Sequence, residues 1–105
     1  MGRSIIWTLE ATDDFDNALT YLGRDSKLYA VRLRDEIYQR VEELLDFPLL
    51  GRSVPEINDA RLRELFVGQY RILYYFESKD ISILSIVHMS RDLVTYWREK
   101  KNKEQ

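Results

Sequence analysis

Hydrophobic residues along this 105-residue chain first form a short continuous run, then recur every three or four positions as in a helix, and finally alternate with polar residues as in a strand. Residues 4–8 are a short, apolar and β-branched run, which predicts an opening strand. Thr12 can cap a helix whose apolar residues recur every three or four positions and whose stop is Gly23. Three carboxylates would lie in its first turn, where they favour the positive end of the helix dipole: Asp13, Asp14 and Asp16.

A second helical stretch follows directly. It begins near Asp25 or Ser26 and ends at Phe47-Pro48, because proline cannot continue a helix. Its single apolar face consists of Ala30, Leu33, Ile37, Val41 and Leu44. Since about three residues join the two helices, we expect an antiparallel helical hairpin. Residues 49–59 contain turn residues and no sustained period, which predicts a loop of ordinary surface character.

From Ala60 onward, hydrophobic and polar residues alternate. This alternation predicts a three-stranded antiparallel meander with strands at about 61–67, 70–77 and 81–88 and turns at Gly68-Gln69 and at Ser78 to Asp80. The last two strands are apolar on both faces, so each face needs cover. In the last strand we expect one face with Ile81, Ile83 and Val87 and an opposite face with Leu84 and Ile86.

Helical spacing returns near the C-terminus. Leu93, Val94 and Trp97 predict a short helix within residues 92–99 after a Ser90 cap, and this helix could cover the second face of the meander. The predicted fold class is therefore α+β: an N-terminal strand, a helical hairpin, a three-stranded meander and a short C-terminal helix. We expect one domain over residues 1–99 and a flexible tail over residues 100–105.

Composition narrows the chemistry. The chain has no cysteine and one histidine, which excludes disulfides and thiolate chemistry and does not favour a zinc site. It also lacks a signal sequence and an apolar run long enough to span a membrane, so we expect a cytoplasmic protein without membrane contact, metal or cofactor. Charge is unevenly divided: residues 1–60 hold 7 Lys/Arg against 12 Asp/Glu, and residues 61–105 hold 9 against 6. The C-terminal half is thus the half suited to an acidic partner.

Several short segments share their order and spacing with a known family. They are Leu44 to Pro48, Gly51 to Glu56, Arg63-Glu64-Leu65, Tyr70 to Tyr74, and Ile83 to His88 with Arg91-Asp92. In these segments the chain resembles the RelE/ParE superfamily of type II toxin–antitoxin toxins, of the plasmid stabilisation type. The resemblance implies a small toxin whose cognate antitoxin wraps it in a toxin–antitoxin hetero-oligomer. We expect the antitoxin to cover the strand faces and to block Arg71 or Arg91.

Two departures bear on the activity that the resemblance implies. RelE-like members cut mRNA in the ribosome, whereas ParE-like members poison DNA gyrase. Leu62 and Glu64 stand where RelE-like nucleases carry lysines, and Trp97 stands where they have a catalytic tyrosine, with Tyr96 one residue short of it. These departures favour the ParE-like branch.

The candidate site consists of Arg71, His88 and Arg91. Guanidinium groups bind phosphate in a bidentate way, and a histidine can act as an acid or a base near neutral pH. Tyr96 or Glu64 could supply part of that acid–base chemistry. In RelE-like nucleases, arginines matching Arg71 and Arg91 contact phosphate. Together these residues could support metal-independent cleavage of RNA.

Each candidate also has a purely structural interpretation. The hairpin register would place Arg71 opposite Phe66 and diagonal to Glu64, which suits an ion pair. His88 could bond only to a loop carbonyl, and Arg91 could simply flank the start of the last helix. We expect two loop residues, Arg52 and Glu56, to pair with each other or with the second helix. The aromatic cluster is expected to belong to the core rather than to stack on bases: Tyr70, Tyr74, Tyr75 and Phe76.

Three functions therefore remain open. The first is a ParE-like toxin that arrests growth by inhibiting DNA gyrase. The second is a RelE-like mRNA endonuclease that acts with the ribosome and is the only one of the three that is an enzyme. The third is a non-toxic module that has kept only its antitoxin interface.

Overall fold

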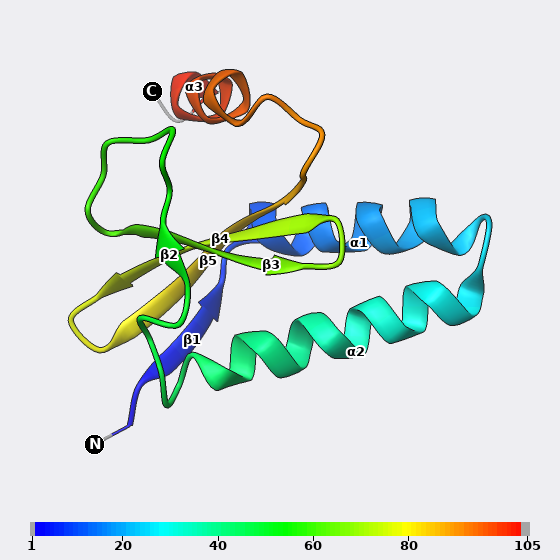
Figure 1. Ribbon diagram of the computed structural model, residues 1–105, viewed down its shortest axis with the longest axis horizontal. Coiled ribbons are helices and arrows are strands. Elements are labelled where there is room, and N and C mark those ends of the chain that lie inside the picture. The colour runs from blue at the N-terminus through cyan, green and yellow to red at the C-terminus, as the bar shows by residue number, and fades with distance from the viewer. Residues whose placement is uncertain (1, 104–105) are drawn as a thin grey trace.

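A five-stranded mixed sheet organises the protein. The computed structural model describes residues 2–103, and the strand order is β1-β5-β4-β3-β2 (Figure 1). The elements are β1 (Ser4–Trp7), α1 (Leu9–Gly23), α2 (Lys27–Glu43), β2 (Arg52–Ser53), β3 (Leu62–Val67), β4 (Tyr70–Glu77), β5 (Asp80–His88) and α3 (Leu93–Lys103). β1 runs parallel to β5, and all other neighbours are antiparallel. The predicted α+β fold and its meander are confirmed.

The helical hairpin is confirmed, but its first helix begins earlier than predicted. The α1 cap is Thr8, whose side chain accepts a bond from the Ala11 amide, so the Thr12 cap was wrong. Thr8 can do this because β1 ends at Trp7 and the next residue is free to leave the strand. α2 is capped by Ser26, which is one of the two predicted start positions. The helix ends at Glu43, and a turn then leads to Phe47-Pro48.

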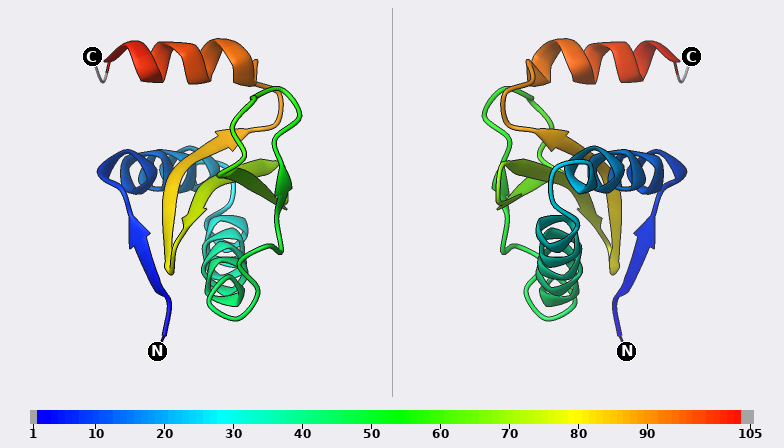
Figure 2. Two further views of the ribbon diagram at one scale, coloured as in Figure 1. Left: turned by 90° about the vertical axis from the view of Figure 1, so that its left-hand side faces the viewer. Right: turned by 90° about the vertical axis from the view of Figure 1, so that its right-hand side faces the viewer.

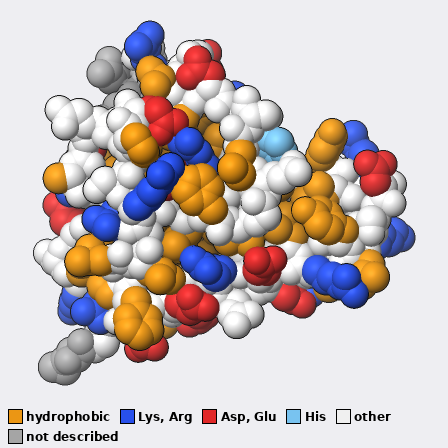
Figure 3. Space-filling model, in the orientation of Figure 1, with side chains coloured by type: hydrophobic (Ala, Val, Ile, Leu, Met, Phe, Trp, Pro, Cys, Tyr) orange, Lys and Arg blue, Asp and Glu red, His pale blue; other side chains and the backbone are white. Residues whose placement is uncertain are grey.

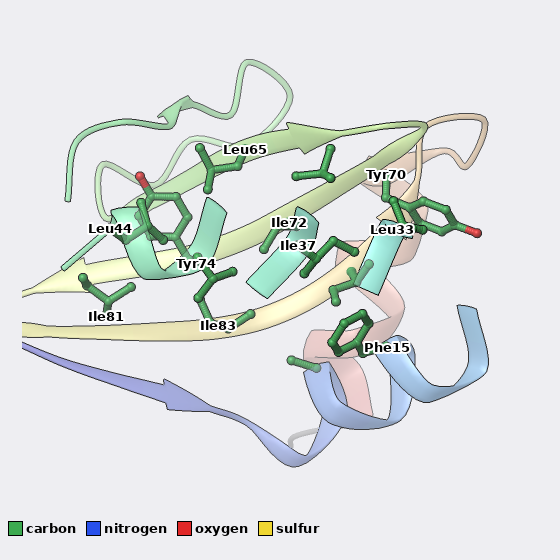
Figure 4. Packing of buried hydrophobic residues seen from close by; sticks show 14 residues of the cluster. Phe15, Leu33, Ile37, Leu44, Leu65, Tyr70, Ile72, Tyr74, Ile81 and Ile83 are labelled. Atoms are coloured by element: carbon green, nitrogen blue, oxygen red, sulfur yellow. The ribbon is translucent and has the colours of Figure 1, made fainter. Parts of the chain in front are cut away.

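The main core lies between the two long helices and one face of the sheet. Figure 4 shows Leu33 and Ile37 of α2, with Leu44 just after its end, packed over Ile72 and Tyr74 of β4. Phe15 from α1 and Ile81 and Ile83 from β5 belong to the same cluster. The apolar residues that recur at helical spacing in α2 therefore pack against those that alternate along the strands, and together they form one apolar layer.

A bulge in β5 reverses part of the predicted face assignment. The β4–β5 register shifts between Leu73 and Tyr74, which leaves one extra residue in β5. Beyond that extra residue the alternation inverts, so Ile86 joins the main core and Val87 joins the opposite face. The prediction that Val87 shares a face of the sheet with Ile81 and Ile83, and Ile86 with Leu84, was therefore wrong.

The opposite face of the sheet is covered by α3. Leu93 and Trp97 pack there on Leu62, Leu73 and Val87. Figure 2 shows α3 at the top, on the other side of the sheet from α2. This cover agrees with the prediction.

The bounds of α3 differ from the prediction at both ends. Its cap is Asp92, which accepts bonds from the amides of Val94 and Thr95, so the Ser90 cap was wrong. The helix continues to Lys103, and Lys100 bonds to the Leu84 carbonyl at 2.8 Å. Residues 100–103, which were predicted to belong to a tail, are the last residues of this helix, and residues 104–105 lie outside the described residues.

Residues 49–59 are more structured than the predicted surface loop. Gly51 and Val54 are buried, and β2 pairs with β3. The Tyr74 hydroxyl, inside the main core, donates to the Pro48 carbonyl at 2.8 Å and accepts from the Gly51 amide at 2.9 Å. A buried tyrosine hydroxyl needs such partners, and these bonds hold the segment against the sheet.

Candidate functional site

Arg71 lies in an ion cluster on the face of the sheet that carries α3. Its Nη1 atom is 2.9 Å from Glu56 Oε2 and 3.2 Å from Glu64 Oε1. Its guanidinium carbon is 5.7 Å from the ring centroid of Phe66, the residue opposite it in the β3–β4 register. The structural interpretation of Arg71, an ion pair with the diagonal Glu64, is thus what the structure contains.

Glu64 is the centre of this cluster. Its side chain is fully buried and its second oxygen accepts a bond from Arg52 Nε at 2.7 Å. Arg52 reaches it because β2 places Arg52 directly opposite Glu64. The expected pairing of Arg52 with Glu56 or with α2 was therefore wrong: Arg52 pairs with Glu64, and Glu56 pairs with Arg71. Two carboxylates thus neutralise two guanidinium groups at this position.

His88 belongs to the other face of the sheet. The register pairs it with Tyr70, and the two rings meet edge to face with centroids 5.2 Å apart. The Ser90 amide donates to His88 Nδ1 at 3.1 Å, and His88 Nε2 lies 3.2 Å from Gln69 Oε1. Both ring nitrogens thus have polar partners from neighbouring residues.

Arg91 shares a surface pocket with His88. The pocket lies between α1 and the ends of β4 and β5, and its lining also includes Asn17, Tyr21 and Tyr70. The Arg91 guanidinium carbon lies 4.6 Å from the ring centroid of Tyr96. A cation and aromatic rings at one pocket are suited to an anion or to an aromatic group of a partner.

Tyr96 belongs to a polar network that joins α1, β5 and α3. Its hydroxyl is 2.6 Å from the buried Ser85 Oγ and 3.2 Å from Asp14 Oδ2. The same Asp14 oxygen accepts a bond from the Ile86 amide beyond the β5 bulge. Burial raises the pKa of Tyr96, so near neutral pH its hydroxyl is protonated and serves as a hydrogen-bond partner.

The five sequence-predicted residues therefore separate into two groups. His88 and Arg91 share one pocket, and Tyr96 lies beside Arg91. Arg71 and Glu64 lie on the opposite face of the sheet from His88, because Arg71 pairs with Val87 whereas the adjacent Tyr70 pairs with His88. Sequence reasoning missed the network residues Asp14 and Ser85, and a serine inside an apolar strand was the available signal.

Asp59, which lies just before the meander, forms a further electrostatic contact with Arg61. Asp59 accepts bonds from the Arg61 side chain and amide and from the Tyr75 hydroxyl. Above all, the Arg61 guanidinium lowers the pKa of Asp59 from 3.8 to about 2. A carboxylate whose pKa falls on folding stabilises the protein above its unfolded pKa, and the contribution is lost as the pH falls through the folded value.

Replacement of Asp59 by asparagine should therefore have a pH-dependent effect. At pH 7 the variant is expected to lose about 1 kcal/mol of unfolding free energy, a value reduced by the half-exposed Arg61. The difference from the wild type should shrink between about pH 4 and about pH 2. Urea unfolding at a series of pH values measures it, and a difference that is constant from pH 7 to pH 3 would contradict the pKa shift.

Within residues 2–103, no group of three or more His, Asp or Glu side chains is placed to hold a metal ion. No helix in that part of the chain is long and apolar enough to cross a membrane.

Comparison with known proteins gives the family. A family model described as the ParE toxin of the type II toxin–antitoxin system, parDE, matches residues 5–93. The chain therefore belongs to the ParE toxin family, as the resemblance of its short segments implied. It is similar in fold to a chain of the chromosomal ParDE toxin–antitoxin system from P. aeruginosa, with 22% identity, a TM-score of 0.66, and coverage of 82% of this chain and 95% of that one. A search of curated protein sequences finds no match.

Proposed function

We propose that this chain arrests growth in the cytoplasm by binding DNA gyrase, and that a cognate antitoxin neutralises it. The family match supports a ParE-like toxin, and the state of Arg71 supports a mechanism based on protein contact. Arg71 is engaged by two carboxylates and by Phe66, on the face of the sheet opposite His88. A phosphate group that bound this guanidinium through Nη1 would compete with both carboxylates for that atom.

Gyrase assays with the purified chain test this proposal. We expect the chain to inhibit DNA supercoiling or to accumulate DNA cleavage complexes, and His88→Gln to leave that inhibition unchanged. The His88 variant is informative because His88 lies on the opposite face of the sheet from Arg71 and because the change removes the proposed acid–base group of the nuclease alternative. Supercoiling and cleavage complexes that remain unchanged by the toxin would contradict gyrase as the target.

The alternative is cleavage of ribosome-bound mRNA. It is supported by the shared pocket of His88 and Arg91, which offers a cation near a histidine. Mapping of mRNA 5′ ends after induction would then show codon-positioned cuts that His88→Gln and Arg91→Gln abolish. Arg91 and His88 are better test positions than Arg71, because loss of Arg71 also breaks an ion cluster.

The third possibility is a chain that binds antitoxin without being toxic. Induction in cells without the antitoxin distinguishes it, since we expect growth to stop. The antitoxin itself is proposed to carry an acidic or apolar segment that covers the strand faces and the positive half of the chain. Charge reversal at Arg71 and Arg91 together should weaken that complex, whereas unaltered affinity would contradict the electrostatic part of this proposal.

A further inference from the structure

Two pockets adjoin one another between α1, the end of β5 and α3. One is the pocket described above, whose lining includes Tyr70, His88 and Arg91. The other lies toward α3, and its lining includes Glu10, Asp13, Tyr96, Glu99 and Lys100. Asp14 and Arg91 line both pockets, so the two meet at these residues. We call the pair the α1–α3 groove, with a Tyr70 end and a Glu99 end.

The Tyr70 end contains a hydroxyl without a partner in the protein. Tyr70 is only 6% exposed, yet within residues 2–103 its hydroxyl forms no hydrogen bond. Figure 4 shows this hydroxyl pointing out of the main core. Burial raises the pKa of Tyr70, so near neutral pH the hydroxyl keeps its proton and can donate it. Largely buried tyrosines usually have a partner for the hydroxyl, so this one is available to a ligand in the groove.

Arg91, where the two ends meet, is an unpaired cation. In the part of the chain that the structure describes, its guanidinium takes part in no ion pair or hydrogen bond. It lies over the Tyr96 ring, which restricts its orientation. The neighbouring Asp14 carboxylate accepts bonds from Ser85, the Ile86 amide and Tyr96 instead. The N–H groups of Arg91 are therefore able to bind a carboxylate of a partner.

The Glu99 end is negatively charged. Glu10 pairs with Lys100 at 2.7 Å, whereas Asp13 and Glu99 are exposed and belong to none of the ion pairs within residues 2–103. A nucleic acid carries a negative charge at every phosphate, so this end would repel it. Figure 3 shows basic and acidic side chains interspersed over the visible face, which also gives no preference for a polyanion. A protein segment can carry both signs of charge, and so it fits both ends of the groove.

We propose that the α1–α3 groove binds an extended segment of the antitoxin, which places an acidic side chain on Arg91 and a basic side chain near Asp13 and Glu99. The Tyr70 hydroxyl donates a hydrogen bond to the same segment. This inference rests on the proposed neutralisation by an antitoxin and adds the site and the order of the two charges. It also moves the expected electrostatic contact away from Arg71, which two carboxylates already neutralise.

Calorimetric titration of the purified chain with the full-length antitoxin encoded next to it tests the groove. Arg91→Glu should weaken binding about 30-fold and Asp13→Lys about fivefold. The matched controls are Arg98→Glu on α3 and Asp16→Lys on α1, both at exposed residues outside the lining of either pocket. They should bind within about twofold of the wild type.

The outcomes separate this inference from the proposed function. If the wild type binds the antitoxin and Arg91→Glu binds it equally well, the groove proposal is overturned while neutralisation stands. If the wild-type chain does not bind the antitoxin, neutralisation itself is contradicted, and the groove proposal fails with it. If Arg91→Glu keeps its affinity for the antitoxin but loses inhibition of gyrase, the groove belongs to the target, which also overturns the proposal.

Tyr70→Phe isolates the hydroxyl. Because this hydroxyl has no partner within residues 2–103, its removal should leave the midpoint of urea unfolding unchanged. The affinity for the antitoxin should nevertheless fall about fivefold, since the bound segment loses one hydrogen bond. An affinity equal to that of the wild type would overturn the role of Tyr70 in binding, and so would a lower unfolding midpoint that accounts for the loss.

Exchange of charges across the interface tests direct contact. Each acidic residue of the toxin-binding segment of the antitoxin is changed to lysine and combined with Arg91→Glu. One combination should restore the affinity to within about tenfold of the wild-type pair, because it recreates an ion pair with its signs reversed. Circular dichroism establishes that Arg91→Glu is folded. If no combination restores binding to the folded variant, the pairing of Arg91 with an acidic side chain is overturned.

Discussion

Replacement of Glu64 by alanine is expected to lower the free energy of unfolding by about 3 kcal/mol. The Glu64 side chain is fully buried and contacts Arg52 at 2.7 Å and Arg71 at 3.2 Å. Its loss leaves the largely buried Arg71 guanidinium with Glu56 as its ion-pair partner and removes the side-chain bond from Arg52 of β2 to β3. Urea unfolding monitored by circular dichroism measures the change.

Glu56→Ala is the matched control for this prediction. Glu56 also pairs with Arg71, but one third of its side chain is exposed, so its ion pair is screened by water. Its loss should cost under about 1 kcal/mol. Equal losses for the two variants would show that burial of Glu64 does not set the strength of the cluster.

Replacement of Gly51 by alanine should destabilise the protein by about 3 kcal/mol, the upper range for overpacking a core. A Cβ atom at this position would lie 2.5 Å from the Glu64 carbonyl oxygen and 2.7 Å from the Tyr74 hydroxyl oxygen. Neither atom can move freely, because one is strand backbone and the other is bonded to Pro48. Thermal unfolding followed by calorimetry measures the loss.

Gly23→Ala provides the opposite expectation at another glycine. A Cβ atom there would lie 3.9 Å from the Ala30 Cβ, an ordinary contact, and Gly23 is the last residue of α1. Alanine favours helix over glycine, so this variant should gain about 0.5 kcal/mol. A loss at Gly23 as large as that at Gly51 would mean that steric contact does not explain the Gly51 effect.

These structural roles affect how mutations of the candidate site should be interpreted. Arg71 and Glu64 hold β2, β3 and residue Glu56 together, so loss of toxicity in an Arg71 variant would not by itself identify a binding or catalytic role. His88 is half-buried and Arg91 is exposed, and both line a pocket away from the Arg71 cluster, where a substitution perturbs fewer buried contacts. Function is therefore best tested at the pocket, with unfolding measured in parallel.

Local patterns were enough to predict most elements of the fold. Alternation of apolar and polar residues predicted the bounds of all three strands of the meander to within one residue, because each strand is apolar on at least one face. The Gly68-Gln69 turn was also readable, since glycine supplies the positive φ of 56° that the first turn position requires. The ion pair between Arg71 and Glu64 followed from that turn, because the turn sets the register of the hairpin.

Other features depend on contacts between residues distant in the chain, and only the tertiary structure decided them. The parallel pairing of β1 with β5 and the pairing of Arg52 with Glu64 both join segments that carry no local signal of their partner. The β5 bulge inverts the faces of Ile86 and Val87 and moves His88 away from Arg71. By itself the sequence determined the strands, the helices and a resemblance to a toxin family, because these rest on local periodicity and residue order. It could not determine that the predicted site is divided between two faces, because one extra residue in a strand changes the direction of every side chain beyond it.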